Sequence, residues 1–564
     1  MEALDWLVIG VFFLALIGII VWVVRQKQND SADYFLGGRD ATWLAIGASI
    51  FASNIGSEHL IGLAGAGASS GMAMGHWEIQ GWMILILGWV FVPFYTRSMV
   101  YTMPEFLERR YNPQSRTILS VISLVSYVLT KVAVTVYAGG LVFQQVFGIK
   151  ELWGIDFFWI AAIGLVVLTA LYTIFGGMKS VLYTSVLQTP ILLLGSLIIL
   201  VLGFKELGGW DEMMRVCGAV TVNDYGDTMT NLIRSNDDAN FPWLGALIGS
   251  AIIGFWYWCT DQFIVQRVLS GKNEMEARRG TIFGAYLKLL PVFLFLIPGM
   301  IAFALHQKYI GAGGEGFLPM LANGTANADA AFPTLVAKLL PAGVKGLVVC
   351  GILAALMSSL ASLFNSSAML FTIDFYKRFK PETPEKKLVG IGQIATIVIV
   401  VLGILWIPIM RSVGDVLYTY LQDVQSVLAP GIAAAFLLGI CWKRTSAQGG
   451  MWGLISGMVI GLTRLGAKVY YSNAGEVADS TFKYLFYDMN WLFFCGWMFL
   501  FCIIVVIVVS LATEAPTAEK IQGLVFGTAT KEQKAATRAS WNHWDIIHTV
   551  IILAITAAFY WYFW

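Results

Sequence analysis

Charged residues are scarce in this chain. Asp, Glu, Lys and Arg make up 13% of its 564 residues, whereas hydrophobic residues make up 58%. This composition excludes a soluble enzyme with a large core and indicates a polytopic membrane protein. The formal net charge is +1, so nothing in the charge balance points to nucleic acid or to an acidic partner.

Cysteine and histidine are also rare, with six Cys and five His. The cysteines have no metal-ligand spacing, and five of them lie in apolar runs, so we expect no disulfide framework. We find neither a Ser/His/Asp arrangement nor a metal-ligand pattern, which makes an enzyme the least favoured class. The sequence also contains no soluble domain and no low-complexity segment.

Apolar runs of about 20 residues predict about fourteen transmembrane helices. The predicted spans are 5–24, 42–67, 78–98, 117–147, 154–175, 181–203, 241–270, 278–305, 344–377, 388–409, 415–441, 447–467, 489–512 and 544–562. Lys and Arg concentrate in alternate loops, which the positive-inside rule assigns to the cytoplasm. Both termini and the acid-rich loop 204–240 then lie outside.

The order of the spans contains a hint of internal symmetry. Polar residues interrupt the span 42–67, and Tyr257-Trp258-Cys259-Thr260-Asp261-Gln262 interrupts the span 241–270, which runs the opposite way. Interrupted segments at matching positions of inverted repeats indicate a transporter's binding site. We therefore divide the chain into an extra N-terminal helix and loop (1–41), a first five-helix repeat (42–203), an external loop (204–240), a second repeat (241–441) and extra C-terminal helices (442–564).

The most informative stretch is Ala52-Ser53-Asn54-Ile55-Gly56-Ser57-Glu58-His59, with five polar side chains in eight positions at mid-membrane depth. An unsatisfied polar group at that depth costs several kcal/mol, so these groups must face protein or a water-filled cavity. Ser53 or Gly56 alone is more typical of helix packing. Asn54, Glu58 and His59 together favour a substrate or ion path.

Other polar groups lie inside apolar spans. Glu78 starts the third span, where it is either an interfacial carboxylate or a ligand group. Lys288 lies well inside its span and could pair with Glu78, in a purely structural ion pair or as a donor to a polyhydroxylated ligand. The amide of Gln422 suits adjacent hydroxyls, although Gln also links membrane helices.

Two further features favour a sugar and a cation. The aromatic run Trp256-Tyr257-Trp258 falls mid-span, where ring faces can stack on a pyranose. Ser358 and Ser359 are adjacent hydroxyls in another span, and unwound carbonyls near Ala52 and Ile55 could complete an oxygen site for Na⁺. A Ser pair in a membrane helix is otherwise a packing feature.

Several motifs give the chain a resemblance to the sodium/glucose symporter branch of the solute:sodium symporter family. They are Asp33-Tyr34-Phe35-Leu36-Gly37-Gly38-Arg39, Phe51-Ala52-Ser53-Asn54-Ile55-Gly56-Ser57, Thr102-Met103-Pro104-Glu105-Phe106-Leu107, Ala170-Leu171-Tyr172-Thr173, Trp256-Tyr257-Trp258-Cys259-Thr260-Asp261-Gln262 and the Ser358–Ser366 region. The resemblance implies an all-α membrane protein built from two inverted five-helix repeats, each opening with a broken helix, with extra helices at both ends.

The resemblance also implies a set of ligand residues. The implied sugar site comprises Asn54, His59, Glu78, Trp258, Lys288 and Gln422, with Tyr257 closing it from the inside and Trp77 beside the carboxylate. The implied sodium site comprises the carbonyls of Ala52, Ile55 and Ala355 and the hydroxyls of Ser358 and Ser359.

The chain departs from the family pattern at four positions. Ser185 replaces an Asp near the sodium path, and Ala361 replaces the hydroxyl residue of members that carry two sodium ions. Both changes argue against a second sodium ion. Gly81 and Gly254 stand where relatives place polar side chains, which leaves open the pattern of sugar hydroxyls that is recognised.

We therefore predict a multi-pass transporter of the plasma (cell inner) membrane. It takes up a neutral glucose- or galactose-like monosaccharide with one Na⁺ by alternating access. The alternatives are a sodium-coupled symporter for inositol or another small solute, and a sugar sensor that does not transport. The expected partners are the sugar, sodium and the lipid bilayer.

Overall fold

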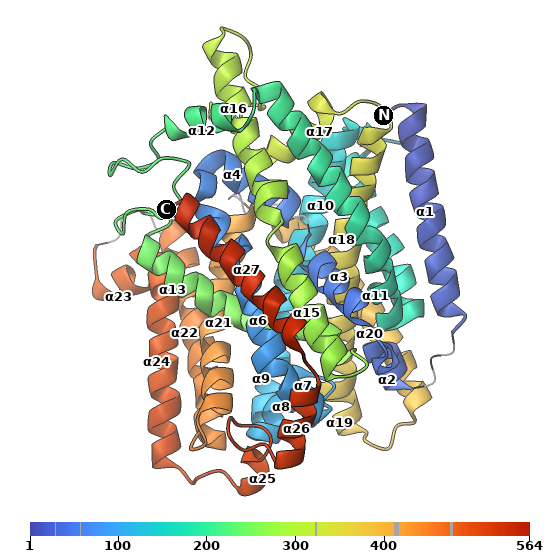
Figure 1. The fold of residues 1–564 in the computed structure, drawn as a ribbon, viewed down its shortest axis with the longest axis vertical. Coiled ribbons are helices and arrows are strands. Elements are labelled where there is room, and N and C mark those ends of the chain that lie inside the picture. The colour runs from blue at the N-terminus through green and yellow to red at the C-terminus, as the bar shows by residue number, and fades with distance from the viewer. Residues whose placement is uncertain (27, 29, 57, 322–323, 411–416, 474–477) are drawn as a thin grey trace.

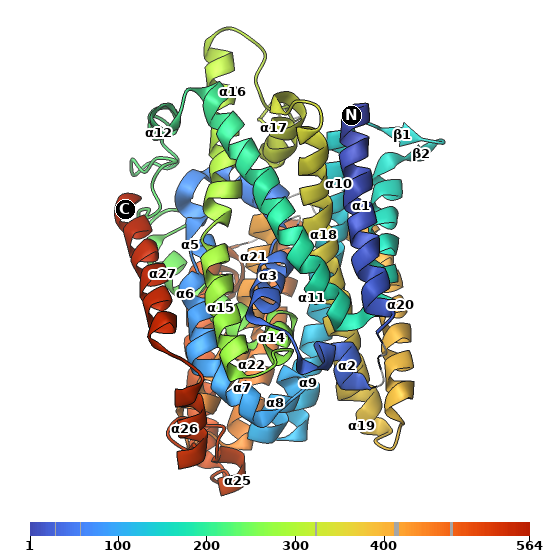
Figure 2. The same cartoon turned by 45° about the vertical axis from the view of Figure 1, so that its right-hand side comes forward.

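The computed structural model describes residues 1–564 except 27, 29, 57, 322–323, 411–416 and 474–477. The described chain is almost entirely helical, and most helices run along the long axis of the molecule (Figure 1). Two short antiparallel strands, β1 (Glu151–Leu152) and β2 (Ile155–Asp156), lie near the N-terminus (Figure 2).

The first third of the chain contains α1 (Ala3–Val24), α2 (Ser31–Leu36), α3 (Trp43–Asn54), α4 (Ala64–Ser70), α5 (Gly75–Glu78), α6 (Gly81–Ile86), α7 (Val92–Ser98), α8 (Met103–Arg110), α9 (Pro113–Ser126), α10 (Ala133–Phe147) and α11 (Phe157–Leu207). The helices that follow are α12 (Trp210–Gly218), α13 (Trp243–Gly254), α14 (Gln262–Leu269), α15 (Glu274–Lys288), α16 (Ile297–Gly311), α17 (Ala331–Leu339), α18 (Val344–Met369), α19 (Lys377–Phe379), α20 (Glu385–Met410) and α21 (Leu417–Cys441). The C-terminal part contains α22 (Ala447–Asn473), α23 (Thr481–Lys483), α24 (Trp491–Ala512), α25 (Ala518–Ile521), α26 (Lys531–Ala539) and α27 (His543–Tyr562).

Eleven helical stretches of the described chain are long and apolar enough to cross a membrane. Two of them each include parts of two predicted spans. The stretch Glu58–Ser98 turns at Gly71 (φ 69°), and α11 turns at Gly177 (φ 54°), where an added Cβ would lie 2.4 Å from the Tyr34 carbonyl oxygen. With α22 added, these stretches account for the fourteen spans expected from the sequence.

The first expected helix break is present in the structure. Helix α3 ends at Asn54, and Ile55 is extended, with φ −83° and ψ 104°. The chain becomes helical again at Glu58. Because the last carbonyls of a helix have no intrahelical partner, carbonyls around Ala52 and Ile55 fall outside the regular helical hydrogen-bond pattern.

The second break lies at Asp261, near the C-terminal end of the predicted interruption Tyr257–Gln262. Helix α13 continues as a π-helical segment over Phe255–Thr260, and the chain becomes extended at Asp261, with φ −77° and ψ 127°. The Asp261 carboxylate caps α14 and pairs with the Lys131 ammonium at 2.6 Å. The residues Tyr257 and Trp258 therefore lie on the π-helical segment, directly before the break.

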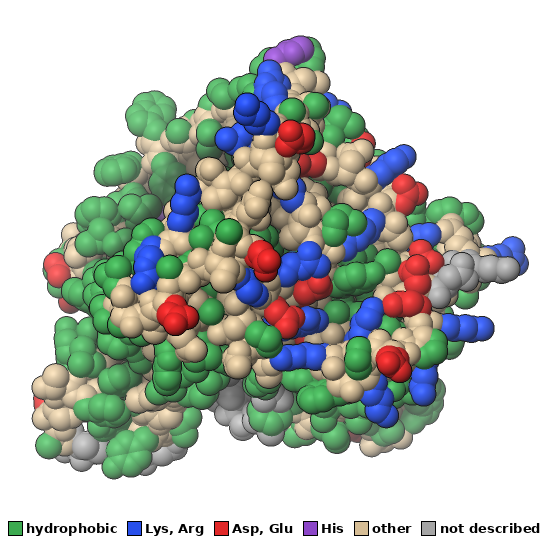
Figure 3. Space-filling model, turned by 90° about the horizontal axis from the view of Figure 1, so that it is seen from below, with side chains coloured by type: hydrophobic (Ala, Val, Ile, Leu, Met, Phe, Trp, Pro, Cys, Tyr) green, Lys and Arg blue, Asp and Glu red, His purple; other side chains and the backbone are tan. Residues whose placement is uncertain are grey.

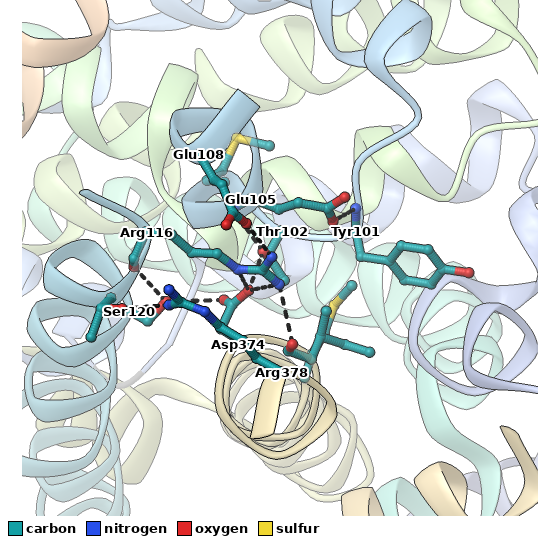
Figure 4. Close-up of polar contacts among 12 residues, drawn as sticks. Tyr101, Thr102, Glu105, Glu108, Arg116, Ser120, Asp374 and Arg378 are labelled. Atoms are coloured by element: carbon teal, nitrogen blue, oxygen red, sulfur yellow. Dashed lines mark hydrogen bonds and ion pairs between the residues drawn. The ribbon is translucent and has the colours of Figure 1, made fainter. Parts of the chain in front are cut away.

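A buried carboxylate ties together the helix ends near α8 and α19 (Figure 4). Asp374 accepts hydrogen bonds from Thr102 Oγ1 at 2.8 Å, from Arg116 Nε at 2.7 Å and from Ser120 Oγ at 3.1 Å. The neighbouring Met103 N donates to Gln262 Oε1 at 2.8 Å. The Thr102-Met103-Pro104 motif thus joins the start of α14 to the chain that follows α18.

Basic residues are numerous on the end of the molecule that carries α8, α19, α25 and α26. Figure 3 looks onto this end and shows many Lys and Arg side chains between Asp and Glu. The long loops around α12 and α17 lie at the opposite end (Figure 1). This distribution follows the alternation of basic loops in the sequence, which predicts that the basic end faces the cytoplasm.

Candidate substrate cavity and sodium site

A cavity lies between the two helix breaks. It is lined by Asn54, Glu58, His59, Trp77, Glu78, Gln80, Lys131, Val134, Thr135, Ile253, Gly254, Tyr257, Trp258, Phe263, Lys288, Ser359, Leu363, Gln422 and Gln425. All seven residues predicted for the sugar site are among them. The lining combines apolar walls with convergent polar groups, as small-molecule sites do.

An ion pair forms the polar centre of the cavity. Lys288 Nζ lies 2.6 Å from Glu78 Oε2 and donates to Asn54 Oδ1 at 3.1 Å. His59 Nε2 lies 3.5 Å from the same Glu78 oxygen. These side chains are almost fully buried. Because the ammonium and the carboxylate neutralise one another, the cavity presents strong hydrogen-bonding groups without a net charge at its centre.

Aromatic rings and amides surround this centre. Tyr257 Oη accepts a hydrogen bond from Asn54 Nδ2 at 3.1 Å, and the Lys288 ammonium lies 5.4 Å from the centroid of the Trp258 ring. Gln422 is buried, and among the described residues its Oε1 has no hydrogen-bond partner. A buried acceptor without a partner is costly, so a ligand hydroxyl donating to Gln422 would be favourable.

Trp77 stacks on Trp491 of α24, with ring centroids 5.5 Å apart. This contact joins the cavity wall to the helices that follow the second repeat.

Lys131 and Gln80 line the cavity but are not among the site residues predicted from the sequence. Lys131 lines the cavity, pairs with Asp261 and is surrounded by the rings of Tyr127, Trp256, Tyr257 and Phe263 at 4.8–5.2 Å. A signal for Lys131 was present, since a lysine inside an apolar span is itself a functional hint. Gln80 also lines the cavity and had no such signal.

The residues predicted to bind sodium lie beside the first break. Helices α3 and α18 pack against one another, and Ala52, Ile55, Ala355, Ser358 and Ser359 are all buried. Ser359 also lines the cavity. Neutral carbonyl and hydroxyl oxygens are the kind of ligand that broken membrane helices offer to Na⁺. Coordination by these five residues stays a prediction.

The position where the family pattern has Asp lies next to this group. Ser185 Oγ is 3.3 Å from Ser358 Oγ and donates to the Val181 carbonyl at 2.6 Å. Ser53 Oγ and Ser362 Oγ, 2.6 Å apart, add a second hydroxyl contact between α3 and α18. The Ser185 hydroxyl therefore stands where the family pattern has a carboxylate, and the polar contacts next to α3 and α18 are made by hydroxyls.

Comparison with known proteins decides the family. The sequence model of the sodium:solute symporter family matches residues 34–457. The chain belongs to the sodium:solute symporter family. Similar curated members include human sodium/myo-inositol cotransporter 2 (36% identical, covering 94% of this chain and 79% of the relative) and the dog sodium/myo-inositol cotransporter (37%, 93% and 76%). Zebrafish sodium/glucose cotransporter 4 is 36% identical and covers 92% of this chain and 80% of the relative.

A solved structure supports the fold of this symporter. A Na⁺-coupled sialic acid symporter in a substrate-bound outward-open state superposes with a TM-score of 0.72 at 22% identity, covering 92% of this chain and 99% of that chain. This likeness confirms the predicted fold class of two inverted repeats with broken first helices. The family assignment confirms a sodium-coupled, multi-pass membrane transporter of small solutes.

Proposed function

We propose that this symporter carries one neutral cyclic polyol together with one Na⁺, and that myo-inositol is its main substrate. The central observation is the neutralised Lys288–Glu78 pair, which is hydrogen-bonded to Asn54 inside a cavity between two helix breaks. Such a centre offers donors and acceptors to hydroxyl groups and gives an anion no unpaired cation.

The choice of substrate departs from the glucose- or galactose-like sugar expected from the sequence. Sodium/myo-inositol cotransporters are prominent among the similar proteins, beside a sodium/glucose cotransporter. They favour the inositol alternative, and the sugar residues Asn54, His59, Glu78, Tyr257, Trp258, Lys288 and Gln422 serve equally well for a cyclitol. Inositol and a pyranose both present a ring of adjacent hydroxyls, so the same amides and charges suit both.

Coupling follows from the position of the two sites on the same broken helix. We assign Na⁺ to the carbonyls of Ala52, Ile55 and Ala355 and to the hydroxyls of Ser358 and Ser359. Asn54 reaches the cavity from the last turn of α3, so an ion that fixes this turn also fixes a substrate ligand. Each ligand then favours the same conformer, and a differential affinity of about 1–3 kcal/mol couples them.

The membrane placement belongs to the same proposal. The basic end in Figure 3 faces the cytoplasm, and the protein works in the plasma membrane in the uptake direction. It binds and moves its solute without chemical change.

Uptake into proteoliposomes tests this function. Labelled myo-inositol, glucose and galactose are offered with an inward Na⁺ gradient or with K⁺ in place of Na⁺. We expect sodium-dependent accumulation, strongest for myo-inositol. Binding without flux, seen as a ligand-dependent change of tryptophan fluorescence, would identify a sensor instead. The absence of both uptake and binding for all three would reject the proposal.

A further inference from the structure

A local break in the helix that follows α4 places two polar residues, Glu78 and Gln80, in the lining of the cavity. Helix α5 ends at Glu78 and α6 begins at Gly81, and the intervening Ile79 and Gln80 have φ and ψ of −81°, 17° and −80°, 22°. In a regular helix, residues two positions apart face nearly opposite directions. The turn therefore allows Glu78 and Gln80 to line the same cavity.

The space for Gln80 is provided by a missing side chain. Gly254 lies on the opposite wall, and a Cβ added there would lie 2.6 Å from Gln80 Oε1 and 2.9 Å from its Cδ. Gly81 allows the close approach of the backbone, since its Cβ would lie 2.8 Å from the Ala285 carbonyl oxygen. The amide of Gln80 thus fills the volume beside Gly254.

The hydrogen bonds of Gln80 fix its orientation and leave part of its capacity unused. Gln80 Nε2 donates to the Ser250 carbonyl at 2.8 Å, and Oε1 accepts from Trp258 Nε1 at 3.3 Å. A glutamine amide has two N–H donors and two acceptor lone pairs. One donor and one acceptor therefore remain on a buried side chain that lines the cavity.

The same contact determines what Trp258 can offer. The indole N–H of Trp258 is directed to Gln80, and the Lys288 ammonium lies over its ring face. The polar part of this wall is supplied by Gln80, while Ile253 and Gly254 beside it are apolar.

We propose that Gln80 is a specificity-determining residue of this symporter, whose amide binds two adjacent hydroxyl groups of the cyclic polyol. This inference rests on the proposed function and deepens it. A buried amide that must give and accept a hydrogen bond discriminates against an analogue lacking one of these hydroxyls, because the amide is then left unsatisfied. Gln80 therefore selects among ring polyols by the presence of that hydroxyl pair.

The test measures sodium-driven uptake by the full-length protein. It compares a parent polyol, with myo-inositol as the first probe, with the series of its monodeoxy analogues, and the parent is the polyol that is transported best. In the wild type, we expect removal of either hydroxyl facing Gln80 to raise KM by about tenfold or more, the equivalent of one buried hydrogen bond. In Gln80→Ala, KM for the parent polyol rises by a similar factor, and the discrimination against those two analogues disappears. Discrimination at the other hydroxyls persists.

Gly254→Ala provides the matched geometric control. Its methyl group displaces the amide without removing it, so it also abolishes the discrimination. Gln80→Ala combined with Gly254→Ala then transports no worse than Gln80→Ala alone. If Gln80→Ala does not fold, Gln80→Met keeps the volume of the side chain and removes both the donor and the acceptor, and it abolishes the discrimination at both hydroxyls.

If the wild type transports the parent polyol but the analogue ratios are unchanged in Gln80→Ala or Gln80→Met, Gln80 is merely structural and the inference alone is overturned. A wild type that transports no polyol would overturn the proposed function together with it.

Discussion

The Lys288–Glu78 pair can be tested by separating its contribution to stability from its contribution to binding. At a separation of 2.6 Å and an effective dielectric constant near 20, the attraction between the two charges is about 6 kcal/mol. Desolvation of the two ions offsets most of it. Lys288→Met leaves the buried Glu78 carboxylate without its main partner, which costs about 3–5 kcal/mol. His59, at 3.5 Å, compensates partly, so we expect a loss of about 3 kcal/mol.

Removing both charges gives the opposite result for stability. Glu78→Gln combined with Lys288→Met replaces the ion pair by neutral groups of similar volume, which is close to neutral for stability. Transport does not return, because neither the ammonium nor the carboxylate is present to bind hydroxyls.

The assay measures denaturant unfolding and sodium-driven polyol uptake on the same preparations of the two single variants and the double variant. We expect stability to fall in the single variants and recover in the double variant, with uptake lost in all three. A stable Lys288→Met with normal uptake, or recovery of uptake in the double variant, would refute the assignment of this pair to the binding site.

Three further changes have defined outcomes. The native Ser185 hydroxyl lies 3.3 Å from Ser358 Oγ, so Ser185→Asp places a carboxylate beside Ser358. This change should lower the sodium concentration for half-maximal uptake severalfold, and an unchanged value would show that Ser185 does not lie on the ion path. Asp374→Asn removes the buried carboxylate that pairs with Arg116, which keeps Glu108 as a second partner, and should destabilise the protein by about 2 kcal/mol. Thr102→Val should cost about 1 kcal/mol, and equal losses in unfolding experiments would contradict the network of Figure 4. In the loop between α12 and α13, burial raises the pKa of Asp238. Hydrogen bonds from the Phe241 N–H, the Asn223 amide and the Asn240 N–H, together with nearby Arg234, outweigh this effect and hold the pKa below its ordinary value of 3.8. A lowered folded-state pKa contributes stability that is present above the ordinary pKa and lost as pH falls through the folded-state value, so acid should increase proteolysis of the loop more in the wild type than in Asp238→Asn; identical acid profiles would argue against it.

The polar centre of the cavity could be predicted from the sequence because each charged residue inside an apolar span is informative on its own. Glu78 and Lys288 stood out by their cost in the membrane, and the structure places them 2.6 Å apart. The two helix breaks were also predictable, since clusters of polar residues at mid-span are incompatible with an uninterrupted anchor helix.

Gln80 could not be recognised in this way. Helical periodicity places it on the face opposite Glu78, and only the turn at Ile79 and Gln80 brings both into the cavity. Its role also depends on the absence of a side chain at Gly254, more than 170 residues away in the chain. The contact of Ser185 with Ser358 is also long-range, so the local sequence does not reveal it. The resemblance to the family was what indicated that Ser185 lies near the sodium path.

We propose that one sodium ion, held beside the helix break after Asn54, drives transport of the polyol that binds in the cavity. The most direct test is the steady-state accumulation of labelled myo-inositol in proteoliposomes at zero membrane potential under an imposed sodium gradient. With one Na⁺ per polyol, a gradient of about tenfold should give an accumulation of about tenfold, since the two free energies balance. Accumulation that does not exceed the external concentration would contradict coupling, and accumulation of about a hundredfold would contradict the single sodium site.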